Sequence, residues 1–237
     1  MADTTTSVEQ TPQIYDDEGD RLLHADQMAD RVILLPAGDP RDVGAADDRI
    51  RIQWGQHLLA DLLSRRYRTL ICGVNPQDNS HGIIGMLSEL LPSSQWNATS
   101  ITQNARTFAN SISENEVLVL KYDMDAVEVL ALLRPPGRDV FYLDDLHRGF
   151  KKITQMMHGR YDRLPCASVS FLGAKSNRLI DNDGNEPTFE AVLRSMYEAG
   201  YRGDVYPSLR MWELAPTGVF AGYPFPKSLD DMRRGGF

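Results

Sequence analysis

The chain of 237 residues is long enough to bury a core without disulfides, and its 42% apolar and 24% charged residues are typical of globular proteins. No apolar run approaches the roughly 20 residues of a membrane span, so a membrane partner is not expected. Residues 1–20 hold six carboxylates and no lysine or arginine, which leaves −2 of the net charge of −8 for the remainder. That near-neutral remainder lacks the basic face that nucleic acid binding requires.

The two ends of the chain differ in composition from its middle. The acidic residues 1–30 predict a flexible tail, and residues 31–205 predict an α/β domain. Residues 206–237 are rich in proline and aromatic rings, so we expect them to pack on that domain or on a partner, including a second copy of the chain. The N-terminus has no basic segment followed by an apolar one, and two cysteines fit a reducing compartment, which predicts a cytoplasmic protein.

Apolar runs and amphipathic segments alternate from residue 32 onward. Short runs rich in branched and aromatic residues predict strands at 32–36, 50–54, 69–74, 117–122, 139–143, 167–172 and 204–207. Apolar residues at helical spacing predict helices at 55–66, 81–91, 100–111, 125–133, 146–157 and 189–199. Thr188 is the expected N-cap of the last helix, and Gly200 is expected to end it in a left-handed conformation.

The order of these elements indicates the fold class. Strands that are continuously apolar, each followed by a helix, favour parallel pairing with helices on both faces of the sheet. We therefore expect an α/β three-layer sandwich with a mainly parallel sheet, Rossmann-like or flavodoxin-like. A (β/α)8-like barrel is the alternative, because eight strands can be counted when every weak candidate is admitted.

Polar residues gather directly after four of the predicted strands. In an open parallel sheet the ligand crevice lies beyond the carboxyl ends of the strands, so we expect the four loops to meet at one edge. The candidate catalytic residues there are Asp78, His81, Asp123, Asp144, Asp145 and His147, and the candidate ligand-binding residues are Asn75, Asn79, Ser80, Arg148, Lys175 and Ser176. Ordinary capping of the following helices is the alternative role for these side chains.

A short acidic motif, residues 123–127, follows the predicted strand at 117–122. This Asp-Met-Asp-Ala-Val segment resembles the DxDx[VT] motif of haloacid-dehalogenase-like phosphatases. The resemblance implies that Asp123 is a nucleophile and Asp125 an acid/base, with Mg²⁺ beside them. The alternative is a capping box, in which Asp125 and Glu128 satisfy the first N–H groups of a helix.

The loop from Asn75 to His81 carries polar side chains between a strand and a helix. Ser80 is expected to cap the helix. His81 then lies in the first turn, where the helix dipole disfavours protonation, so a neutral imidazole could act as a base. Lys175 and Ser176 lack the full spacing of a phosphate-binding loop.

Two functions of different classes fit these features. The first is a protein that binds or converts a small phosphorylated or sugar-like molecule in the strand-end cleft, with Mg²⁺ as the cofactor considered. The second is a non-catalytic interaction or scaffold protein whose aromatic C-terminal segment contacts another subunit. The sequence fits an enzyme and a binding protein equally.

Overall fold

The computed structural model describes nine segments of the chain. These are residues 32–35, 50–53, 58–64, 67–90, 97–113, 116–124, 127–158, 166–168 and 178–206. The predicted N-terminal tail and the C-terminal segment beyond Tyr206 lie outside them. Within these ranges, none of the helices has the length and apolar character needed to cross a bilayer.

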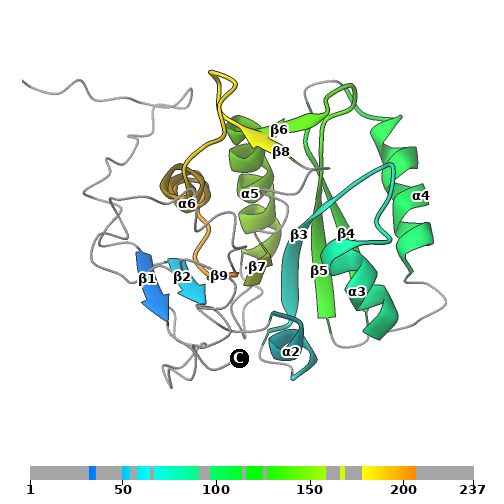
Figure 1. The fold of residues 1–237 in the computed structure, drawn as a ribbon, viewed down its shortest axis with the longest axis horizontal. Coiled ribbons are helices and arrows are strands. Elements are labelled where there is room, and N and C mark those ends of the chain that lie inside the picture. Colours follow the sequence, from blue (N-terminus) through cyan, green and yellow to red (C-terminus); the bar gives the residue numbers. More distant parts are fainter. Residues whose placement is uncertain are drawn as a thin grey trace, which may run out of the picture.

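A seven-stranded sheet forms the centre of the described structure, in the order β1-β2-β9-β7-β3-β5-β4 (Figure 1). All neighbouring strands in it are parallel except β4 and β5, which are antiparallel. Two further strands, β6 and β8, form a separate parallel pair. The strands span Val32–Leu35 (β1), Ile50–Gln53 (β2), Thr69–Val74 (β3), Leu118–Met124 (β4), Val127–Leu133 (β5), Val140–Tyr142 (β6), Cys166–Ser168 (β7), Arg178–Ile180 (β8) and Asp204–Tyr206 (β9).

Helices pack against this sheet through two separate apolar cores. One core joins Leu70 and Cys72 of β3 to α2, α3 and α4, whereas the other joins Ile71 of the same strand to α5 and α6. Successive side chains of a strand point to opposite faces, so the two cores lie on the two faces of the sheet. Figure 1 shows α3 and α4 on one side of β3, β4 and β5, with α5 on the other. The helices span Leu58–Leu63 (α2), Gly82–Leu90 (α3), Ala98–Ala109 (α4), Leu143–Met157 (α5) and Phe189–Glu198 (α6).

The α/β class expected from the sequence is confirmed, and the barrel alternative is wrong. The sheet is open, with β1 and β4 at its two ends. Both expected ends of the last helix are also confirmed. Thr188 accepts a hydrogen bond from the backbone N–H of Ala191 at 3.2 Å, and Gly200 follows the helix with a φ of +87°.

The helix predicted at 125–133 is wrong, because Val127–Leu133 forms strand β5. Val127 and Val129 belong to one core, and Leu130 and Leu132 to the other, so this strand is apolar on both faces. Such a short apolar run fits a helix and a buried strand equally well by its pattern. Pairing with β3 on one side and β4 on the other decides in favour of the strand. Strand β8 was not predicted, and β6 pairs with it outside the main sheet.

A buried carboxylate ties β2, β9 and the start of β3 together. The Asp204 side chain is fully buried and accepts hydrogen bonds from Arg51 Nε at 2.5 Å, from Gln53 Nε2 and from the Tyr67 hydroxyl. A buried charge is tolerated only when it is paired and hydrogen-bonded, and Asp204 meets both conditions. We call these four residues the Asp204 cluster.

Removing the charge of Asp204 should weaken the fold strongly. Asp204→Asn leaves the Arg51 guanidinium buried without its carboxylate, which we expect to lower the free energy of unfolding by about 3–5 kcal/mol. The milder Tyr67→Phe, which deletes one donor to a charged acceptor, should lower it by about 1.5–3 kcal/mol.

Urea denaturation measures both values. Asp183→Asn, at an exposed carboxylate in the turn after β8, is the matched control and should change stability by no more than about 0.5 kcal/mol. Equal stability of Asp204→Asn and this control would contradict a stabilising role of the Asp204 cluster.

Candidate functional site

Two asparagines hold the loop after β3 in shape. The backbone N–H of Asn75 donates to Asn79 Oδ1 at 2.9 Å, and Asn79 Nδ2 donates back to the Asn75 carbonyl at 2.6 Å. Asn75 Oδ1 also accepts from the Gln77 N–H at 2.9 Å. Both asparagine side chains are buried, so in the structure they position the loop, and a ligand contact from either stays a prediction.

Thr102 joins this loop to α4. Its hydroxyl accepts from Asn79 N at 3.1 Å and Asn79 Nδ2 at 3.0 Å, and donates to the Ala98 carbonyl at 2.7 Å. A hydroxyl has one proton and two lone pairs, so the hydrogen-bonding capacity of Thr102 is filled. The loop and the first turns of α4 are therefore fixed relative to each other.

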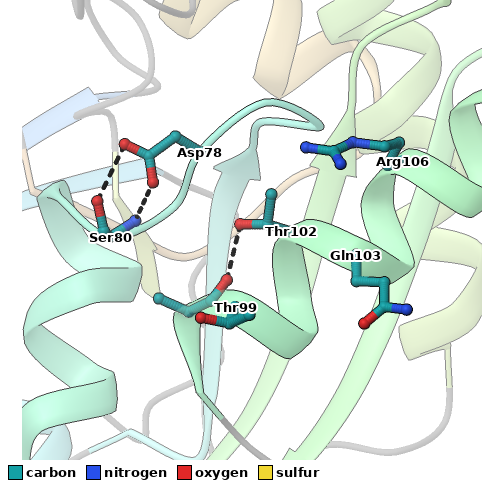
Figure 2. A pocket seen from close by; sticks show the side chains of 7 residues that line it. Asp78, Ser80, Thr99, Thr102, Gln103 and Arg106 are labelled. Atoms are coloured by element: carbon teal, nitrogen blue, oxygen red, sulfur yellow. Dashed lines mark hydrogen bonds between the residues drawn. The ribbon is translucent and has the colours of Figure 1, made fainter.

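A pocket of about 360 Å³ lies between the loop and α4 (Figure 2). Thr99, Thr102, Gln103 and Arg106 recur at spacings of three and four residues, which places them along one side of α4. The loop contributes a carboxylate and a hydroxyl. The described residues that line it are Asp78, Ser80, Ala98, Thr99, Thr102, Gln103 and Arg106.

The Asp78 carboxylate is held in place by Ser80. It accepts from the Ser80 backbone N–H at 2.8 Å and from the Ser80 hydroxyl at 3.0 Å. These two hydrogen bonds, the backbone one first, lower the pKa of Asp78 below its usual range, and the nearby His81 adds a smaller effect in the same direction. Asp78 therefore presents a fixed negative charge to the pocket at neutral pH.

Arg106 supplies the positive charge of the pocket. Its Nε donates to the Pro76 carbonyl at 3.3 Å, so the guanidinium leans toward the loop from α4. Figure 2 shows Asp78 and Arg106 on opposite sides of the pocket, with Thr99 and Gln103 projecting from the helix. Oxygen acceptors, hydroxyls, an amide and a guanidinium together suit a small polar ligand.

A close approach of α3 supports the same loop. A Cβ atom on Gly85 would lie 2.2 Å from the Ser80 carbonyl oxygen, so only glycine fits there. Helix α3 begins at Gly82, which has a φ of +69°, so the residue before the helix is the exposed His81. Ser80, which was expected to cap the helix, instead donates its hydroxyl to Asp78.

The predicted residues after β6 form a separate cluster at the start of α5. Asp145 is fully buried and pairs with Arg148 Nη2 at 2.5 Å and Arg138 Nη1 at 3.1 Å. It also accepts from the Tyr142 backbone N–H at 3.0 Å, which is the capping role considered as the alternative. His147 Nδ1 lies 3.2 Å from the Ser195 carbonyl oxygen of α6.

This second cluster is not part of the pocket. Helix α5 packs in the core shared with α6, whereas the α4 helix of the pocket packs in the core on the other face. Asp144 is exposed at the start of α5. A catalytic role for Asp144, Asp145 or His147 stays a prediction.

The expectation that Asp123 joins the strand-end cleft is wrong. Strand β4 runs antiparallel to β5, and Asp123 stands opposite Glu128, which in turn is level with Thr69 at the start of β3. Asp123 therefore lies at the amino edge of the parallel strands, away from the loop that follows Val74. Its carboxylate is 73% exposed and pairs with Lys121 at 3.2 Å.

The capping box of Asp125 and Glu128 is also wrong, because Glu128 belongs to a strand. Its carboxylate pairs with Lys121 Nζ at 3.0 Å and accepts from the Thr69 hydroxyl at 3.1 Å. Asp125, Lys175 and Ser176 lie outside the described residues.

Sequence reasoning missed all of the described pocket residues that come from α4, which are Ala98, Thr99, Thr102, Gln103 and Arg106. Their spacing on a predicted helix was visible, but a polar stripe on a helix is usually its solvent face. No group of three His, Cys, Asp or Glu side chains that could hold a metal ion occurs in the described segments.

No known protein-family model matches this chain, and no curated protein matches it significantly.

The hydrogen bonds from Ser80 should be visible in the titration of Asp78. The carboxyl carbon of Asp78, followed by NMR, should titrate below the ordinary value of about 3.9. In Ser80→Ala the hydroxyl donor is lost while the backbone N–H remains, so the midpoint should rise part of the way toward that value. An unchanged midpoint in Ser80→Ala would contradict the role of the hydroxyl.

The fit of α3 against the loop can be tested at Gly85. Gly85→Ala should lower the free energy of unfolding by about 1–3 kcal/mol, because the loop or the helix must shift to admit a methyl group. The amide resonances of Ser80 and Asn79 should move with it. Met86→Ala, at an exposed position on the same helix, is the control. Unchanged loop resonances in Gly85→Ala would refute the close packing.

Proposed function

We propose that this protein binds a small phosphorylated or sugar-like molecule at the carboxyl end of β3, within a Rossmann-like three-layer sandwich. The observation that carries this proposal is the pocket between Asp78, Ser80 and the polar side of α4. Its volume of about 360 Å³ is near the lower end of the roughly 300–1,000 Å³ typical of ligand sites, which favours a compact ligand.

The topology of the sheet supports this location. Strands β3 and β7 are parallel neighbours. The chain leaves β3 toward α3 on one face, whereas the next helix that the structure describes after β7 is α6 on the other face. Ligands of open α/β sheets bind beside such a switch point, beyond the carboxyl ends of the strands. The loop from Asn75 to Ser80 borders that point.

The chemistry of the pocket favours binding over proton transfer at Asp78. A carboxylate whose pKa lies below its usual range is a weak base at neutral pH. It is well suited to accept hydrogen bonds from ligand hydroxyl groups. We therefore propose a binding role for Asp78 and assign no reaction to the site.

NMR titration of the labelled protein with glucose and with glucose 6-phosphate tests the proposal. We expect the amide resonances of Ser80, Thr99 and Gln103 to move on addition of at least one of these probes. Gln103→Ala should weaken that binding about twofold to tenfold, the effect of one lost hydrogen bond.

Gln155→Ala is the matched control, since Gln155 is an exposed glutamine on α5, across the sheet from the pocket. Shifts confined to the first turn of α5 would place the ligand beside Asp145, Arg138 and Arg148 and refute the proposed site. The absence of shifts at millimolar concentrations of both probes would also refute it.

A further inference from the structure

We infer that the ligand of this pocket is a sugar acid, a polyhydroxylated molecule with one carboxylate, with its carboxylate on Arg106 and its hydroxyls toward Asp78. The inference rests on the proposed function, because it concerns the same pocket. It narrows the ligand from a sugar-like or phosphorylated molecule to one with a single negative charge.

The two charged groups of the pocket are positioned but not neutralised by each other. Asp78 is held by the N–H and the hydroxyl of Ser80, and Arg106 by the Pro76 carbonyl, so the hydrogen-bonding partners of both are neutral. Figure 2 shows the Asp78 carboxylate turned toward Ser80 and the Arg106 side chain apart from it, with Thr102 between the two in this view. Each charged side chain is thus held in one orientation, and a ligand can supply the group that complements its charge.

The Arg106 side suits a carboxylate. Because Nε is engaged by Pro76, the terminal nitrogens of the guanidinium are the donors directed away from that contact. A guanidinium binds carboxylates and phosphates through parallel N–H···O bonds, so its geometry alone fits either group. The choice between them depends on the other charge in the pocket.

Asp78 disfavours the more highly charged anion. With one carboxylate and one guanidinium, the described lining residues have no net charge. A phosphate monoester carries close to two negative charges at neutral pH, so one of them would face Asp78 without a cation. A carboxylate carries one charge, which Arg106 alone can balance.

The remaining lining fits hydroxyl groups better than an aromatic base. Ser80, Thr99 and Gln103 provide hydroxyls and an amide, and none of the described lining residues carries an aromatic ring. Protein sites that bind nucleobases without a pairing strand commonly stack them on aromatic side chains. Vicinal hydroxyls of a sugar can instead donate to the Asp78 carboxylate.

Isothermal titration of the full chain with gluconate, glucose and glucose 6-phosphate tests this inference. We expect gluconate to bind at least about tenfold more tightly than glucose, the effect of one charge-assisted contact. Arg106→Gln should remove that preference. Asp78→Asn should weaken gluconate and glucose together but improve the binding of glucose 6-phosphate about fourfold, since one repulsive charge is lost.

Arg178→Gln and Asp183→Asn are the matched controls, at an exposed arginine and an exposed aspartate outside the pocket, and they should leave all three affinities unchanged. Tighter binding of glucose 6-phosphate than of gluconate by the unmodified chain would overturn the sugar-acid assignment and leave the proposed function standing. Failure of all three probes to bind would overturn both.

Discussion

The buried carboxylate of Asp204 is the contact on which the order of the strands depends. It receives hydrogen bonds from Arg51, Gln53 and Tyr67, which are 137 to 153 residues away in the sequence. These bonds place the last described strand, β9, between β2 and β7, in the interior of the sheet. Because a buried charge without partners is costly, the cluster disfavours arrangements in which β2 and β9 are apart.

The same contact fixes where β3 begins, and thereby where its loop begins. Tyr67 stands two residues before β3, and Asp204 is level with Leu70 through Cys166 of the intervening strand. The Asp204 cluster is therefore near the amino end of β3, and the Asn75 loop is at the carboxyl end. These two polar groups have separate roles, since one holds the sheet together and the other shapes a pocket.

The pocket itself is built from neutral contacts. The side chains of Asn75, Asn79 and Thr102 form hydrogen bonds within the loop and to α4. Gly85 has no side chain, which allows α3 to approach the loop backbone closely. The groups that hydrogen-bond to Asp78 and Arg106 are also neutral, so these two side chains are held in place without an opposite charge beside them. Such preorganisation reduces the ordering that a ligand would otherwise have to impose.

The sequence by itself determined the α/β class, the strand at 69–74, the cap at Thr188 and the polar loop after β3, because these depend on local periodicity and turn chemistry. Only the tertiary structure decided that 127–133 is a strand, since both faces of that run are apolar and its partners are distant in the chain. Because β5 follows β4 directly and pairs with it in antiparallel fashion, Asp123 near the end of β4 lies at the edge of the sheet opposite the predicted cleft. The structure alone also brought Arg106 to the loop, because contact between residues 76 and 106 depends on how α4 packs against β3 and α3, which no local pattern encodes.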